Sequence, residues 1–140
     1  MDIKFSSTIF LMDKQMRIRV PSRKITAIIE FSNESPNTVK ALIKALPIQS
    51  TLDRWGDEAL FRVPIEVKLE SNARVDVEVG EIGYWDVEPS ICIFFGPTPV
   101  STTEKPKAYS PVNVLGKIID VDPRVFSIVE DGDKVIIENI

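Results

Sequence analysis

The sequence predicts a single, mainly β domain, a closed structure of about eight strands with one or two helices. Short segments that alternate or are rich in β-branched residues recur along most of the chain, separated by turn residues. Only one segment has convincing helical spacing of its apolar residues. The length of 140 residues suits one domain with one sizeable core. Closure into a barrel is expected because it removes exposed strand edges.

The first two strands are expected to form a hairpin. Residues 16–20 alternate around Ile18, residues 21–24 form a turn, and residues 25–31 are rich in β-branched side chains. Further strands are expected over 58–63, 65–69, 75–79, 91–95, 112–121 and 134–138. Pro64 lacks the N–H needed for a ladder and marks an edge, a bulge or a bend between two of them.

The main helix is expected to begin at Ser35-Pro36, a capping residue followed by proline at the first helical position. An apolar stripe at positions i, i+3, i+4 and i+7 runs from Val39 to Leu46, and Pro47 ends the helix. Residues 122–128, which start Asp-Pro, can form a helical turn as a short second helix. The main helix should cover one opening or flank of the β core.

The composition excludes several classes of function. The chain has no histidine, which excludes Ser-His-Asp and Cys-His triads and histidine-ligated metal sites. Its single cysteine, Cys92, excludes an internal disulfide and thiolate zinc clusters. Cys92 lies in the apolar run ICIFF, which favours a small buried hydrophobe over a reactive thiol. We therefore expect no metal and no cofactor.

The charge and hydropathy patterns also restrict the partners. The 17 basic and 21 acidic residues include no run of five like charges, so no nucleic-acid partner is predicted. No apolar stretch approaches the roughly 20 residues that cross a bilayer, so no membrane partner is predicted. The start of the chain lacks the pattern of a signal peptide, and the single cysteine suits a reduced compartment. A cytoplasmic location is expected.

The most informative stretch runs from Gly80 to Pro99, GEIGYWDVEPSICIFFGPTP. It contains a glycine turn, an aromatic pair, an apolar run and a Pro-Thr-Pro tip, and a second proline-bounded loop follows at 106–111. Proline and glycine set loop shape, and aromatic rings offer contact area at low entropic cost. Two interpretations stay open. Either Trp85 and Phe94 cap the core between stiff loops, or these segments line one pocket, because loops on a rigid scaffold are the usual place for binding.

The pocket interpretation names seven candidate ligand-binding residues and an unidentified small molecule or peptide as partner. Asn113 is unusual because a buried amide must find hydrogen-bond partners, either in a loop backbone or in a ligand. No spacing of carboxylates indicates a pair of catalytic acids, so no catalytic residue is predicted. The candidates are Tyr84, Trp85, Phe95, Thr98 and Asn113, with Trp55 and Glu58 nearby.

Three motifs together resemble a family of small prokaryotic proteins with the cyclophilin-like fold and no assigned function. They are WGDEALFRVP (residues 55–64), VGEIGYWDVEPSICIFFGPTP (residues 79–99) and PVNVLGKI (residues 111–118). The resemblance covers roughly residues 16–140 and implies an eight-stranded, mostly antiparallel barrel with a helix packed at one end. Residues 1–15 lie outside it, and are interpreted as an extension or an extra edge strand before the barrel domain of residues 16–140.

The resemblance also raises two enzymatic alternatives to a non-catalytic binding protein. True cyclophilins are prolyl isomerases with a Phe-His-Arg strand, whereas this chain has Phe61-Arg62-Val63-Pro64 and lacks the other groove residues. In the isomerase alternative, Arg62 weakens conjugation across the amide; otherwise Arg62 is a surface residue of its strand. A remote alternative is a barrel associated with amide hydrolysis, for which Lys117 is the nearest candidate, although it is expected to face solvent.

Overall fold

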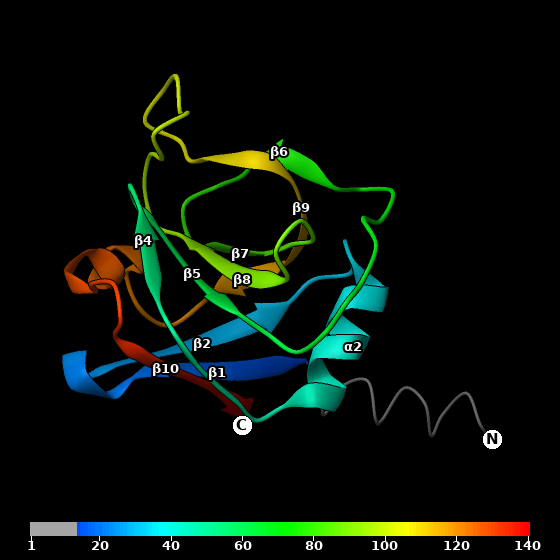
Figure 1. Cartoon of the computed structure of the whole chain (residues 1–140), viewed down its shortest axis with the longest axis horizontal. Coiled ribbons are helices and arrows are strands. Elements are labelled where there is room, and N and C mark those ends of the chain that lie inside the picture. The colour runs from blue at the N-terminus through cyan, green and yellow to red at the C-terminus, as the bar shows by residue number, and fades with distance from the viewer. Residues whose placement is uncertain (1–13) are drawn as a thin grey trace.

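The computed structural model describes residues 14–140, which form one antiparallel sheet of ten strands with one main helix (Figure 1). The helix is α2 (Pro36–Ala45), and two short 3-10 helices are η1 (Pro21–Arg23) and η2 (Pro123–Ile128). The strands are β1 (Gln15–Val20), β2 (Ile25–Phe31), β3 (Ile48–Thr51), β4 (Asp53–Trp55), β5 (Glu58–Arg62), β6 (Arg74–Asp76), β7 (Glu81–Trp85), β8 (Ser90–Phe94), β9 (Lys107–Ile118) and β10 (Lys134–Asn139).

The prediction of a closed, eight-stranded barrel is wrong in closure and in strand number. The strands pair in the order β3-β10-β1-β2-β9-β7-β8-β5-β4, with β6 added to β9. The two ends of this path, β3 and β4, are consecutive in the chain and are joined through Leu52. The backbone of Leu52 bonds to the turn before β10, donating to Asp133 O (2.8 Å) and accepting from Gly132 N (2.8 Å). The chain connection therefore brings the ends of the sheet together without a ladder between them.

The extra strands arise where the sequence suggested loops. Residues 48–55, for which no strand was expected, contain β3 and β4, and residues 81–85 of the stretch from Gly80 to Pro99 form β7. The strand expected over 65–69 is absent from the structure, in which that segment is irregular. The helix after Ser35 and the helical turn at 122–128 are confirmed. The proposed extension over 1–15 lies outside the described residues except for its last two positions, of which Gln15 opens β1.

Two buried clusters share the central strands of the sheet. Ile91 and Ile93 of β8 belong to the main core, whereas Cys92 and Phe94 of the same strand belong to a second cluster. Successive side chains of a strand point to opposite faces, so β8 is buried on both faces. This double burial explains why the run ICIFF is apolar throughout. The second cluster consists of Val77, Cys92, Phe94, Ala108, Val112 and Val114, with Leu60 and Trp85 packed against it.

The long strand β9 pairs with three other strands and approaches one of them, β2, very closely. Its early part pairs with β6, and its later part pairs with β7 and β2. At Gly116 an added Cβ would collide with the carbonyl oxygen of Glu30 on β2, so only glycine fits. The pairing of β9 with β7 is irregular next to this glycine, because Ile82 pairs with Gly116 whereas Gly83 pairs with Val114. As a result, β9 leaves the main core and reaches over the second cluster.

Candidate functional site

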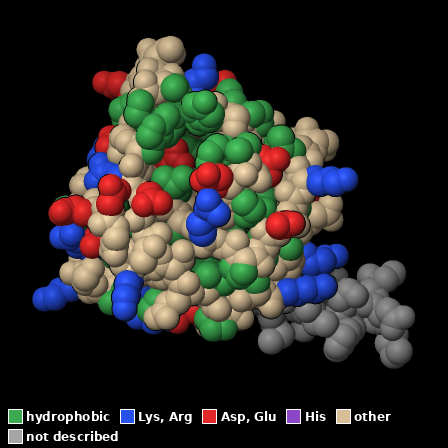
Figure 2. Space-filling model, in the orientation of Figure 1, with side chains coloured by type: hydrophobic (Ala, Val, Ile, Leu, Met, Phe, Trp, Pro, Cys, Tyr) green, Lys and Arg blue, Asp and Glu red, His purple; other side chains and the backbone are tan. Residues whose placement is uncertain are grey.

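A pocket of about 310 Å³ opens beside the second cluster, on the face of β5 and β8 that is turned away from the main core. Strand β4, the early part of β9 and the end of β7 complete its walls. Figure 2 shows hydrophobic side chains gathered near the top of the molecule, around a hollow with acidic side chains inside it. The lining residues are Asp53, Arg54, Trp55, Glu58, Leu60, Trp85, Cys92, Ala108, Tyr109 and Val112.

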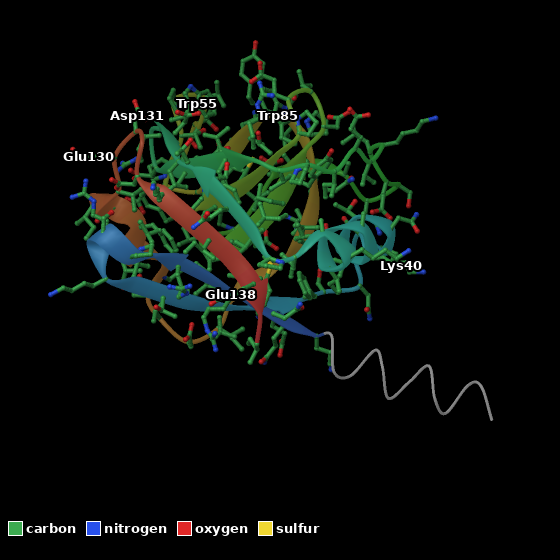
Figure 3. The ribbon with its side chains drawn as sticks, turned by 60° about the horizontal axis from the view of Figure 1, so that its bottom comes forward. Lys40, Trp55, Trp85, Glu130, Asp131 and Glu138 are labelled. Atoms are coloured by element: carbon green, nitrogen blue, oxygen red, sulfur yellow. The ribbon has the colours of Figure 1, made fainter. Side chains whose placement is uncertain are left out.

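Three aromatic rings form one wall of the pocket. Tyr109 meets Trp55 edge-on with ring centroids 6.0 Å apart, and meets Trp85 in the same way at 6.3 Å. The indole N–H of Trp85 donates to the hydroxyl of Ser110 at 2.7 Å, which fixes that ring. Trp55 and Trp85 lie at the same end of the molecule, away from Lys40 on α2 and Glu138 on β10 (Figure 3). Tyr109 remains 71% exposed, although it is a large ring held by two others.

Glu58 places a carboxyl group in these apolar surroundings. It is only 5% exposed, opens β5 and lies on the same face of that strand as Leu60. Leu60 pairs with Cys92 across the ladder, so the Cys92 side chain is a diagonal neighbour of the Glu58 carboxyl. Burial raises the pKa of Glu58 to about 7, and hydrogen bonding from the Cys92 thiol opposes this rise. The pKa of Cys92 is raised well above its ordinary value, chiefly by burial, so the thiol stays protonated.

Arg54 is the basic residue in the lining, but its guanidinium group is engaged elsewhere. It donates to the carbonyl oxygens of Gly56 (3.0 Å), Ser127 (2.9 Å) and Val129 (2.9 Å). It also donates to Asp57 at 3.4 Å. Its carbon Cζ lies 5.0 Å from the centre of the Phe95 ring. These contacts tie Arg54 to the turn around η2, so its charge does not neutralise Glu58.

The turn between β4 and β5 is held by the Pro-Thr-Pro tip. Gly56 has φ +59°, and a Cβ there would lie 2.7 Å from the ring of Pro99, so a side chain is excluded. The N–H of Asp57 donates to Pro97 O at 3.0 Å, and the N–H of Phe95 donates to Asp57 O at 2.9 Å. The tip thus buttresses the turn that presents Trp55 and Glu58 to the pocket.

The structure brings three of the seven candidate residues to this pocket: Trp55, Glu58 and Trp85. Tyr84 and Phe95 belong instead to the main core. The hydroxyl of Tyr84 donates to Ile65 O at 3.0 Å and accepts from Val67 N at 3.2 Å, so it holds the irregular segment that follows β5.

The other two candidates, Thr98 and Asn113, make structural hydrogen bonds to the backbone. The hydroxyl of Thr98 donates to Lys107 O. Asn113 accepts from Glu70 N at 2.8 Å and donates to Lys68 O at 3.0 Å, which is the loop-backbone alternative foreseen for it. Neither residue lines the pocket.

Sequence reasoning did not single out the other lining residues. Tyr109 had a visible signal, because it is the aromatic residue inside the proline-bounded loop 106–111 that the sequence already associated with a pocket. Cys92 is buried as expected, yet it also lines the pocket. The remaining residues carry no signal of their own, because their place depends on strand register: Asp53, Arg54, Leu60, Ala108 and Val112.

Comparison with known proteins identifies the family. The family model described as cyclophilin-like matches residues 14–138. The chain belongs to the cyclophilin-like family. It is similar to the hypothetical protein AF2241 from Archaeoglobus fulgidus, known from a solution structure, with 38% identity and a TM-score of 0.77. The likeness covers 92% of this chain and 96% of that one. No curated protein matches.

A second solved structure shares the fold at much lower identity. It is McbB in complex with tryptophan, with 16% identity and a TM-score of 0.70. The match covers 89% of this chain and 44% of that one, so this chain spans less than half of McbB. At this identity the likeness shows the fold alone.

Within this cyclophilin-like chain, the residues of the enzymatic alternatives lie outside the pocket lining. Arg62 is exposed and pairs with Glu88 at 3.2 Å on the surface of β5. Lys117 is exposed on β9, as the sequence led us to expect. Among residues 14–140, no helix is long and apolar enough to cross a membrane.

Proposed function

We propose that this cyclophilin-like protein binds a small, ring-bearing molecule in the pocket beside its second cluster, without catalysing a reaction. The observation that carries the proposal is the burial of the Glu58 carboxyl in a pocket walled by aromatic rings. Small-molecule sites are typically apolar with a few placed polar groups, and a volume of about 310 Å³ is at the lower end of their range. The cytoplasmic location expected from the cysteine content is part of the same proposal.

The aromatic wall supports this proposal over a purely structural role. A ring that only completes a core loses its contact with water, whereas Tyr109 is 71% exposed beside two half-buried tryptophans. Exposed aromatic surface around a concavity is typical of ligand sites. The tryptophan held by McbB belongs to a distant relative of the same fold, so here it serves only as one compound to test.

Binding should be visible in the intrinsic fluorescence, because both tryptophans of the chain line the pocket. We expect phenethyl alcohol, a neutral aromatic probe, to change that emission saturably. Trp85→Ala should abolish most of this binding, measured by calorimetry, yet lower the free energy of unfolding by only about 1 kcal/mol, because the ring is a half-buried wall. Tryptophan is tested by calorimetry, since its own emission overlaps.

The matched control is Val87→Ala, which truncates an exposed side chain just beyond β7 and should change neither quantity. A loss of about 3–5 kcal/mol in Trp85→Ala would instead identify Trp85 as core. An emission spectrum that does not respond to saturating probe would contradict the proposed function.

Prolyl isomerisation by Arg62 is the second candidate, favoured by the family alone. We expect the protein to leave the cis/trans exchange of a proline peptide at its uncatalysed rate, because Arg62 is solvent-exposed and paired with Glu88. The measurement compares the exchange rate with and without catalytic amounts of protein. If the wild type accelerated the exchange and Arg62→Ala abolished that acceleration, the function would be isomerisation instead of binding.

A further inference from the structure

We propose that the ligand carries a protonated amine, which pairs with the Glu58 carboxylate while its ring lies among Trp55, Tyr109 and Trp85. This inference rests on the proposed function and adds the chemical class of the ligand. It is drawn from the charges that face the pocket, from the fixed contacts of Arg54 and from the position of Glu58 on β5.

Within residues 14–140, Glu58 is a buried acid without a basic partner. Other part-buried acids among residues 14–140 form ion pairs with arginines: Glu138 pairs with Arg19 at 2.8 Å, and Glu81 pairs with Arg74 at 2.8 Å. Glu58 takes part in no ion pair of this part of the chain. A buried carboxylate is costly unless it is paired. A cation from outside the chain would supply the missing partner.

The groups around the pocket favour a positive ligand. Strand β4 contributes Asp53, an exposed acid at the rim, and Arg54, whose guanidinium group donates to the carbonyls of the turn around η2. Strand β8 contributes the protonated thiol of Cys92, and β9 contributes the aromatic ring of Tyr109. Strand β7 contributes the uncharged Trp85. Two acids therefore face the pocket, and the single base is already engaged.

The aromatic wall suits the same ligand class. An ammonium group is attracted to the faces of tryptophan and tyrosine rings, and the attraction grows when both are removed from water. Because Trp55 and Trp85 each meet Tyr109 edge-on, ring faces stay available for contact with a ligand. An arylalkylamine could thus place its ring against this wall and its nitrogen at Glu58.

Binding of such an amine should be coupled to loss of a proton. In the free protein the pKa of Glu58 is raised to about 7, so the carboxyl is largely protonated in mildly acidic solution. An ammonium group favours the carboxylate and lowers that pKa. Below pH 7 the affinity should therefore fall by about tenfold per pH unit. Above pH 7 it should stay level until the amine itself loses its proton, near pH 10.

The experiment compares three probes of nearly equal shape: phenethylamine, phenethyl alcohol and phenylpropionate. At pH 8 we expect the amine to bind at least about tenfold more tightly than the alcohol, as for one charge-assisted hydrogen bond, and the acid to bind most weakly. Calorimetry at pH 6 in two buffers of different ionisation enthalpy should show proton release with the amine and none with the alcohol.

Three variants locate the effect. Glu58→Gln should abolish the preference for the amine and the proton release while retaining the alcohol. Asp53→Asn should weaken the amine by only a few fold, because an exposed rim charge is screened. Glu88→Gln, the same change on an acid outside the lining, should leave all three affinities as in the wild type.

The outcomes separate this inference from the proposed function. Equal affinities for amine and alcohol in the wild type would overturn the amine inference and leave the binding pocket standing. An amine preference that survives in Glu58→Gln would overturn the role of Glu58. Failure of all three probes to bind would overturn the proposed function and this inference together.

Discussion

Glu58→Gln should make the protein more stable than the wild type at pH 8, by about 3 kcal/mol. Burial raises the pKa of Glu58 from its ordinary value of 4.5 to about 7, and this rise corresponds to about that free energy by linkage. At pH 8 the wild type holds a buried, unpaired carboxylate, whereas glutamine has the same shape and no charge. The measurement is the free energy of unfolding by urea at a series of pH values.

The sign of the pH dependence is fixed by which state holds the proton more tightly. Between about pH 4.5 and 7 the folded protein keeps a proton on Glu58 that the unfolded chain releases, so Glu58 costs more stability as the pH rises through this window. The advantage of Glu58→Gln should therefore vanish near pH 4, grow up to about pH 7 and then stay constant. Because every other carboxyl group titrates alike in both proteins, the difference isolates Glu58. If the difference in unfolding free energy between Glu58→Gln and the wild type were the same at every pH, burial would not raise the pKa of Glu58.

Asn113→Ala should cost about 3 kcal/mol or more of stability at any pH between 6 and 8. The amide is fully buried, and it bonds to Glu70 N (2.8 Å), Lys68 O (3.0 Å) and the hydroxyl of Thr38 (2.9 Å). Truncation removes the partner of two part-buried backbone groups of the loop, each at a cost of about 1–3 kcal/mol, and also one of the two hydrogen bonds of the buried Thr38 hydroxyl. It leaves a cavity as well. Urea unfolding of the variant provides the measurement.

Asn72→Ala is the matched control, because Asn72 also donates its amide to a backbone carbonyl, that of Glu34, at 3.2 Å, but in an exposed setting. It should cost no more than about 0.5 kcal/mol. A small effect of Asn113→Ala, comparable with that of Asn72→Ala, would mean that the loop 66–73 and α2 do not depend on this amide.

Asn113 also shows how far sequence reasoning reached. Its isolation between apolar residues marked it as a buried amide that needs partners, and the structure supplies them from a loop and a helix. The identity of those partners could not be predicted, because Thr38 and Lys68 are 75 and 45 residues away along the chain. The same limit applies to Tyr84, whose hydroxyl turned out to bond to the backbone of the irregular segment after β5.

The sequence alone determined the strands with clear alternation and the helix, which begins with a proline and carries an apolar stripe. It also determined the aromatic, proline-rich segments that contribute to the pocket. These features depend on residues close together in the chain, so local spacing records them. Only the tertiary structure decided the strand order, the connection at Leu52 that joins the sheet ends without a ladder, and the second cluster. These features depend on which distant strands pair. The tertiary structure also decided the charge state of the site. Nothing in the sequence distinguishes Glu58 from the other acidic residues. In the fold the pocket walls bury its carboxyl group, and Arg54 donates to the carbonyl oxygens near η2 instead of pairing with it.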